Sequence, residues 1–183
     1  MTTSSEYEPK PTTNPEILIQ PDYIYRSGEI ADATAIQLVI ERAIAARKGD
    51  PIPSRITKPD YIRQNEELLS KESTWSRLVF NGDMLIGLTI GIPSTDLSTG
   101  EIIPNKQHLV LLMVDPEHWR KGIGSNLLDW VDNDMTRRRV ESIELWTGID
   151  NHRSRALYER KGYRATGIES TQYGRQVQYE KYL

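Results

Sequence analysis

The stretch LVLLMVDPEHWRKGIGSNLL, residues 109–128, decides the fold of this chain. Its first six residues are apolar, and with His108 they predict a short strand over 108–114 that is buried in the protein. A basic pair and two glycines follow, and apolar residues at helical spacing begin directly after them. A strand, a cationic glycine loop and a helix start are typical of an anion site, because helix N-terminal amides attract negative charge. A tight turn with solvated basic side chains explains the same residues, and two glycines alone do not decide between them.

The glycine loop departs from both common nucleotide-binding signatures. The P-loop pattern GxxxxGK[ST] is absent. Leu127 occupies the place of the third glycine in the GxGxxG fingerprint of dinucleotide-binding folds. Residues 115–121 also separate the strand from the first glycine, whereas the dinucleotide fingerprint follows its strand almost directly. These departures disfavour a dinucleotide site.

Composition restricts the class of protein further. A chain of 183 residues with 37% hydrophobic and 27% charged residues is typical of one globular domain. A net charge of -3 provides no general attraction to nucleic acid or to an anionic membrane. Cysteine is absent, and the three histidines (His108, His118 and His152) are not paired at metal-ligand spacing, so we expect no metal. No apolar run is long enough to span a bilayer and no signal-peptide segment is present, which predicts a cytoplasmic protein.

Hydrophobic periodicity and turn residues predict a mixed α/β domain over residues 21–183, preceded by a disordered tail over 1–20 that is rich in Ser, Thr, Pro and Glu. The expected order is β-α-α-β-β-β-α-β-α-β-β. Its elements are a strand over 23–30, a helix over 31–48 with Asp32 as N-cap, a helix through Leu69 opened by a capping box over Thr57–Asp60, a hairpin around Asn81-Gly82, a loop over about 93–106, a strand over 108–114, a helix over 123–135, a strand over 142–149, a helix over 151–162 and two terminal strands.

Two motifs in this order identify a family resemblance. VDPEHWRKGIGSNLLDWV (114–131) is followed, after one predicted strand, by NHRSRALYERKGY (151–163). Together they resemble the GNAT superfamily of N-acetyltransferases, which has a (Q/R)xxGx(G/A) loop and an NxxAxxLYxxxGF-like helix. The resemblance follows the element order over about 20–183 and is specific over 109–163. Trp119, Ser154 and Tyr163 depart from the usual Gln or Arg, Ala and Phe of these motifs.

The resemblance implies a single-domain GNAT-like fold, with a mixed central sheet flanked by helices, that binds acetyl-CoA as co-substrate. It places the pyrophosphate on the amides of Arg120, Lys121, Gly122, Ile123, Gly124 and Ser125. Backbone groups of Leu112, Met113 and Val114 would pair with the pantetheine arm as an added strand does. Asn151 would contact the pantetheine region, although a helix N-cap role fits the sequence equally well. The side chains of Arg120 and Lys121 would reach the CoA phosphates, or they are solvated.

For the chemistry, the resemblance implies acetyl transfer to a primary amine by direct attack in a ternary complex. Tyr158 is the candidate acid for the leaving thiolate, and its alternative role is that of a core aromatic residue. His108 is the candidate base, because an imidazole titrates near neutral pH, and Glu144 is the second candidate. A strand N–H near Met113 suits the developing oxyanion. His118 and His152 are weaker candidates on loops.

The acceptor is the least determined part. In the family it binds between the first two helices and the loop that joins the last two strands. Asp60, Glu66 and Glu67 fall near that region and could pair with a cationic amine, although helix charges are usually solvated. The expected acceptor is an amine-bearing small molecule, peptide or protein, and the resemblance also allows a homodimer. The alternative function is a non-catalytic acyl-CoA-binding regulatory domain on the same fold.

Overall fold

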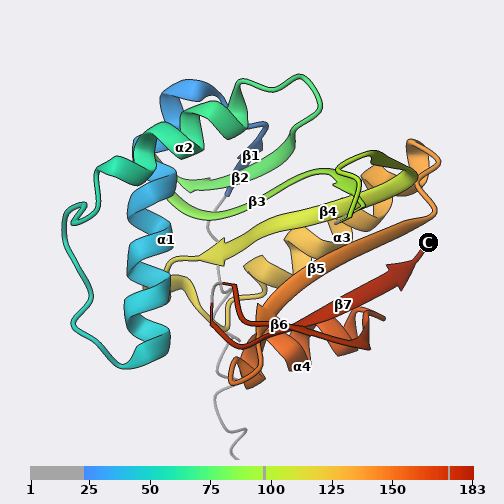
Figure 1. Cartoon of the computed structure of the whole chain (residues 1–183). Coiled ribbons are helices and arrows are strands. Elements are labelled where there is room, and N and C mark those ends of the chain that lie inside the picture. Colours follow the sequence, from blue (N-terminus) through green and yellow to red (C-terminus); the bar gives the residue numbers. More distant parts are fainter. Residues whose placement is uncertain (1–22, 97, 173) are drawn as a thin grey trace, which may run out of the picture.

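The computed structural model describes residues 23–96, 98–172 and 174–183, so the predicted tail over 1–20 lies outside the described residues. The predicted order of helices and strands is confirmed (Figure 1). Two short 3₁₀ helices, η1 (Ile30–Asp32) and η2 (Pro116–His118), accompany these elements. The helices and strands are β1 (Ile24–Arg26), α1 (Ala33–Lys48), α2 (Asp60–Leu69), β2 (Trp75–Asn81), β3 (Met84–Thr95), β4 (Ile102–Val114), α3 (Ile123–Arg137), β5 (Ser142–Gly148), α4 (His152–Arg160), β6 (Arg164–Ser170) and β7 (Gln176–Tyr182).

The described residues form one seven-stranded sheet in the order β1-β2-β3-β4-β5-β7-β6. Neighbouring strands are antiparallel except for β4 and β5, which are parallel. A parallel pair needs a crossover connection, and α3 provides it. The β2–β3 hairpin turns at Gly82, which has a φ of 58°, while Asn81 is still part of the strand. The predicted mixed α/β fold is thus confirmed.

Helices cover both faces of the sheet. Ile36 and Val39 of α1 pack with Leu88 and Ile90 of β3 on one face. On the other face, Leu128 and Met135 of α3 belong to a larger cluster that includes residues of β5, α4 and β7. The helical spacing that predicted α3 is borne out for all but one of its apolar positions, since Trp130 is half-buried and the others are buried: Ile123, Leu127, Leu128, Val131 and Met135.

β4 has a neighbouring strand on both edges in its first half but on only one edge in its second half. It pairs with β5 only from Lys106 to Leu109, whereas its other edge pairs with β3 as far as Val114. Opposite Ile90 and Gly91 the register shifts by one residue, which leaves Val110 as a bulge. The bulge reverses the alternation of faces, so Leu109 packs toward α3 whereas Leu111 packs toward α1. Only Leu109 of the predicted buried strand is fully buried, because beyond this residue β5 no longer covers one edge.

Two predicted helix caps are wrong. The Asp32 side chain does not cap α1 and instead accepts hydrogen bonds from the Glu29 amide and from the Arg26 guanidinium. Thr57 does not cap α2, since its hydroxyl donates to Glu41 at 2.6 Å. In both cases a buried or half-buried group from another element supplies a stronger partner than the helix end, because a hydrogen bond to a charged group is the stronger kind.

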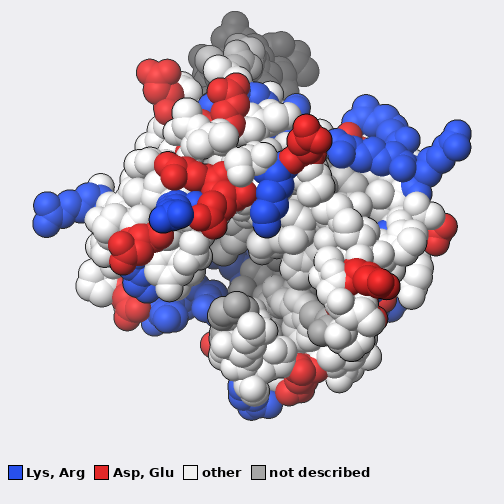
Figure 2. Space-filling model, turned by 45° about the horizontal axis from the view of Figure 1, so that its top comes forward, with Lys and Arg blue, Asp and Glu red and all other residues white. Residues whose placement is uncertain are grey.

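The predicted loop over 93–106 is also wrong for most of its length. β3 continues to Thr95 and β4 begins at Ile102, with Thr95 opposite Ile102 and Pro93 opposite Gln107. β3 and β4 pair with each other over this region, and this pairing extends both strands. The sequence of either segment alone does not indicate it. Among the described residues, no helix has the length and apolar character that crossing a membrane requires. Acidic and basic side chains lie mixed over much of the face in Figure 2.

Candidate functional site

The loop between η2 and α3 has an unusual backbone conformation. Arg120 and Gly122 both adopt left-handed backbone conformations, with φ of 67° and 82°. A left-handed residue next to right-handed ones turns successive amides toward one side, which forms an anion-binding concavity. None of the backbone N–H groups of 120–125 donates a hydrogen bond to another described residue. Six consecutive amides, the last three at the N-terminus of α3, are therefore available to an anion.

Cationic side chains gather beside these amides. Arg120 and Lys121 are exposed, and no described carboxylate lies within ion-pair distance of either. Arg153 of α4, which sequence reasoning missed, stacks over the Trp119 ring with its guanidinium 4.2 Å from the ring centroid. Burial, and then the nearby charge of Arg120, lower the pKa of Arg153. Like charges without counter-ions point to a negatively charged ligand at this place.

Trp119 stands at the start of the loop, where the motif quoted above has Gln or Arg, and its side chain holds the loop against β4. Its indole N–H donates a 2.7 Å hydrogen bond to the carbonyl oxygen of Val114. This contact joins the loop to the end of β4. The carbonyl oxygen of Val114, which the sequence suggested as a partner for the pantetheine arm, is therefore already hydrogen-bonded within the protein. Leu112 and Met113 lie on the segment of β4 that has lost β5, so one strand edge is open there to an extended ligand.

Gly124 and Asn151 have structural roles in this region. A Cβ atom at Gly124 would lie 3.3 Å from Leu157 Cδ2, so this glycine permits the close approach of α3 and α4. The Asn151 side chain accepts a hydrogen bond from the Ser154 amide at 3.4 Å and so caps α4. The side chain of Ile123 is buried in the core, which leaves only its backbone amide for a ligand.

Tyr158 is buried in the cluster between the sheet and the helices α3 and α4, with 5% of its surface exposed. Its ring packs edge-on against Tyr163, with 5.8 Å between the ring centroids. Burial raises the pKa of the Tyr158 hydroxyl, so the phenol stays protonated at neutral pH. The hydroxyl has no hydrogen-bond partner among the described residues. A protonated donor without a partner has the chemical properties of a general acid, although the ring itself packs as a core aromatic does.

His108 and Glu144 are direct neighbours in the parallel pair β4–β5. The distance from His108 Nδ1 to Glu144 Oε1 is 3.5 Å, and Lys106 Nζ lies 2.9 Å from Glu144 Oε2. Burial by itself would raise the pKa of Glu144, but the hydrogen bonds and charges of His108 and Lys106 lower it to about 2. A carboxylate that is so weakly basic is a poor proton acceptor near pH 7. Of the two candidate bases, His108 is the better suited.

The other two histidines do not join this group. His118 is buried in η2, where its Nδ1 lies 3.8 Å from Asp115 Oδ1, and His152 is exposed at the start of α4. Among the described residues, no cluster of His, Asp and Glu side chains has the arrangement of a metal site.

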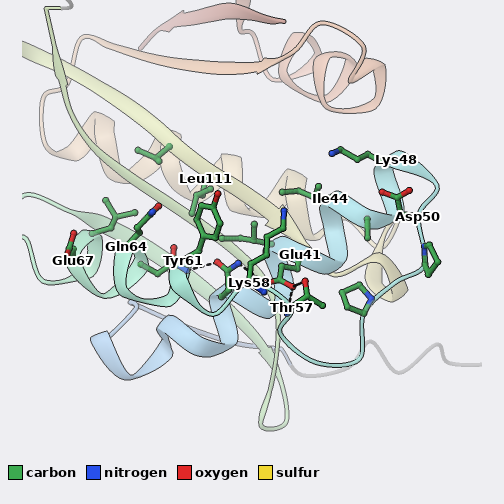
Figure 3. A pocket seen from close by; sticks show the side chains of 18 of the residues that line it. Glu41, Ile44, Lys48, Asp50, Thr57, Lys58, Tyr61, Gln64, Glu67 and Leu111 are labelled. Atoms are coloured by element: carbon green, nitrogen blue, oxygen red, sulfur yellow. Dashed lines mark hydrogen bonds between the residues drawn. The ribbon is translucent and has the colours of Figure 1, made fainter. Parts of the chain in front are cut away.

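A cavity of about 740 Å³ lies between α1 and α2, above the β4 bulge (Figure 3). Ile40 and Ile44 of α1 and Val110 and Leu111 of β4 contribute apolar surface to it. Tyr61, Gln64 and Lys58 project from α2 and the segment before it, and Lys48 extends from the end of α1. Of the three carboxylates that the sequence suggested for the acceptor, Glu67 lines the cavity, whereas Asp60 and Glu66 do not.

Glu41 fixes one wall of the cavity. Its carboxylate accepts hydrogen bonds from the Thr57 amide, the Thr57 hydroxyl, the Lys58 amide and the Gln37 side chain, at 2.6–3.0 Å. Burial favours a raised pKa, but these hydrogen bonds outweigh it and lower the pKa of Glu41 to about 2. All of its acceptor positions are used inside the protein. Glu41 therefore holds the segment between α1 and α2 in place and is not available to bind an amine.

The sequence profile of the Acetyltransferase (GNAT) family matches residues 40–163, which include the cavity wall, the glycine loop and α4. The chain belongs to the GNAT acetyltransferase family. The family is one of acetyltransferases.

Similar proteins agree with this assignment. Mycothiol acetyltransferase from Beutenbergia cavernae is 33% identical over 116 residues, which are 62% of this chain and 35% of the relative. The chain thus spans about a third of the length of that curated GNAT relative. PaiA N-acetyltransferase from Thermoplasma acidophilum, solved with coenzyme A, superposes with a TM-score of 0.69 at 22% identity over 88% of this chain and 99% of that one. The ribosomal-protein-S18-alanine N-acetyltransferase from Escherichia coli superposes with a TM-score of 0.65 at 19% identity, over 87% of this chain and 93% of that one. At these identities the two structures show a shared GNAT fold.

Proposed function

We propose that this GNAT enzyme transfers the acetyl group of acetyl-CoA to a primary amine held in the cavity between α1 and α2, with both substrates bound together. The observation that carries the proposal is the row of six unpaired amides at 120–125, with Arg120, Lys121 and Arg153 beside it. This donor set suits a pyrophosphate, which needs many N–H donors and positive charge. With the pyrophosphate held there, the pantetheine arm and the acetyl group of acetyl-CoA extend along β4 toward the cavity.

Each part of the chain has a separate task in this proposal. The amides of 120–125 hold the pyrophosphate, and the open edge of β4 at Leu112 and Met113 holds the pantetheine arm as an added strand. Acetyl-CoA supplies a thioester, whose acyl carbon is open to attack by an amine. A backbone N–H near Met113, on the edge of β4 that faces away from β3, is the proposed donor for the negative charge that develops on the thioester oxygen.

Two side chains move protons. An amine is largely protonated at neutral pH and must lose a proton before it can attack, and His108 is the proposed acceptor of that proton. The departing sulfur needs a proton, and Tyr158 is the proposed donor. The raised pKa and the unpartnered hydroxyl of Tyr158 support this role, since an ionised phenol has no proton to give.

The acceptor is proposed to be an amine with an apolar body. Ile40, Ile44, Val110 and Leu111 form an apolar lining that such a body can cover, and its burial there is favourable at about 25 cal/mol per Å². Glu41 has no free acceptor position for an ammonium group. Specificity thus follows from the shape and apolar character of the cavity more than from a buried carboxylate.

A thiol-release assay tests the proposal with little interference, because the chain has no cysteine and only coenzyme A contributes a new thiol. The acceptor panel contains a small apolar amine, a polyamine, an alanine-terminated peptide and a peptide with a free lysine side chain. We expect release with at least one amine and the highest kcat/KM with the apolar one. Acetyl-CoA binding without thiol release from any amine would support a regulatory domain instead.

A further inference from the structure

A half-buried polar cluster lies across the strands β4, β5 and β7. Lys106 Nζ lies 2.9 Å from both Glu144 Oε2 and Glu180 Oε1, so one ammonium group joins β4, β5 and β7. Gln178 Nε2 donates a 3.1 Å hydrogen bond to the same Glu144 oxygen. Glu144 itself is 8% exposed. Burying a charge is unfavourable unless it is paired, so such a cluster often has a role beyond folding.

The cluster faces the acceptor side of the sheet. Leu109, Ile143 and Leu145 pack toward α3 and α4, so the residues that alternate with them, His108 and Glu144, face α1. Past the bulge, Leu111 lies on that same α1 face and lines the cavity. The β4–β5 pairing ends one residue after His108 and Glu144. The pair therefore lies beside the start of the open strand edge, on the same face of the sheet as the cavity, although neither residue lines the cavity itself.

We infer that Glu144 is a positioning residue that fixes the ring orientation and tautomer of His108. In this arrangement Nδ1–H of His108, which lies 3.5 Å from Glu144 Oε1, is the ring's hydrogen-bond donor toward the carboxylate, and Nε2 is the nitrogen with a free lone pair. A neutral imidazole has one donor and one acceptor nitrogen, and the partner of one nitrogen decides the state of the other. This inference rests on the proposed role of His108 as the base.

The partners of Glu144 are divided between its two oxygens. Lys106 and Gln178 both bind Oε2, whereas Oε1 is the oxygen that faces His108. The carboxylate is thereby held in one orientation, with one oxygen reserved for the ring. The charged groups near His108 are Lys106 on its own strand, Glu144 on β5 and, through Lys106, Glu180 on β7; opposite it on β3 is the apolar Ile92.

The test compares Glu144→Gln with the matched control Glu180→Gln. Both remove one carboxylate from Lys106, but only Glu144 contacts His108. For Glu144→Gln we expect kcat to fall about tenfold to a hundredfold with an unchanged KM for acetyl-CoA, because an amide can hold the imidazole in the wrong tautomer. Glu180→Gln keeps kcat within about twofold.

A double-variant cycle separates positioning from other roles. If Glu144 acts through His108, Glu144→Gln has little further effect on kcat in a His108→Ala background. Melting temperatures and acetyl-CoA affinities establish that the variants are folded. Should Glu144→Gln fail to fold, Glu144→Asp keeps the charge, withdraws it from Nδ1 by one methylene, and is expected to lower kcat in the same direction.

Three results would overturn the inference, and they differ from failure of the proposed function. Equal losses in Glu144→Gln and Glu180→Gln indicate a structural network. Additive losses in the double variant indicate that Glu144 acts independently of His108. If kcat falls in His108→Ala but is unchanged in Glu144→Gln, the positioning role of Glu144 is excluded while His108 keeps its role as the base. Full kcat in His108→Ala contradicts the base assignment itself, and the positioning role is lost together with it.

Discussion

Replacing Tyr158 by Phe separates the chemistry of this residue from its packing. The ring is 5% exposed and contacts Tyr163 and Tyr179 in the core, and Phe keeps nearly all of that apolar contact. The only atom lost is the hydroxyl oxygen with its proton. If the phenol protonates the leaving sulfur, the acyl-transfer rate should fall by a factor of about 10² to 10⁴, the usual contribution of general acid catalysis.

The expected effect on stability is small. The hydroxyl has no partner among the described residues, so its removal breaks no hydrogen bond within them. The hydroxyl oxygen is also not one of the fully buried polar atoms without a partner, so its removal recovers no penalty for an unpaired buried group. We expect the free energy of unfolding to change by less than about 1 kcal/mol, which moves the melting temperature of a domain of this size by no more than roughly 2–4 °C. The variant should bind acetyl-CoA with unchanged affinity.

Three measurements on the one variant decide the matter. Thiol release gives kcat, calorimetry gives the dissociation constant of acetyl-CoA, and a thermal melt gives stability. Near-normal turnover in Tyr158→Phe would refute the acid role and leave Tyr158 as a core aromatic. A fall in melting temperature well beyond about 4 °C would refute the reasoning that the hydroxyl makes no stabilising contact within the protein.

Three further predictions concern the cavity wall, the sheet and the phosphate site. Because the pKa of Glu41 is about 2, below its ordinary value of 4.5, its stabilisation is complete above about pH 4.5 and is lost as the pH falls toward 2. Glu41→Gln should lower the free energy of unfolding by about 2 kcal/mol at pH 7, after allowance for solvent screening, and by almost nothing near pH 2 in denaturant titrations. Gly91→Ala should cost about 3 kcal/mol, seen as a lower denaturation midpoint, because its Cβ would lie 1.9 Å from the Trp75 ring; a midpoint within error of the natural protein would contradict this. Arg153→Met keeps the contact with Trp119 but should raise the calorimetric Kd for acetyl-CoA about five- to tenfold at low salt and less at high salt, and a salt-independent change would exclude a phosphate contact.

Local sequence patterns predicted those parts of the fold that depend on local physics. The apolar spacing of α3 and the hairpin around Asn81-Gly82 both carry their signal within a few residues, and both are confirmed, with the turn itself one residue later than the pair suggests. The glycine loop was also identified locally, because Gly122 needs a left-handed conformation that other residues adopt at a cost. The conformation of this loop could thus be anticipated from the sequence, and its role as an anion site remains a proposal.

Features set by distant partners were not predicted. The strand pairing of Pro93 with Gln107 turned an expected loop into two longer strands. The Thr57 hydroxyl donates a hydrogen bond to the buried Glu41 carboxylate on α1 and does not cap α2. The bulge at Val110, which brings His108 and Leu111 to the same face of β4, follows from the register with β3. No pattern within one segment reports these pairings, because they depend on which elements become neighbours.

The phosphate site can be tested at the level of single amides. Titration of ¹⁵N-labelled protein with acetyl-CoA, followed by NMR, reports the backbone N–H groups that acquire a new acceptor. We predict saturable shifts that are largest for the amides of 120–125, together with changes along β4 at Leu112 and Met113, and no such response to NAD. Saturable binding of acetyl-CoA that leaves the amides of 120–125 unshifted would contradict the assignment of this loop as the pyrophosphate site.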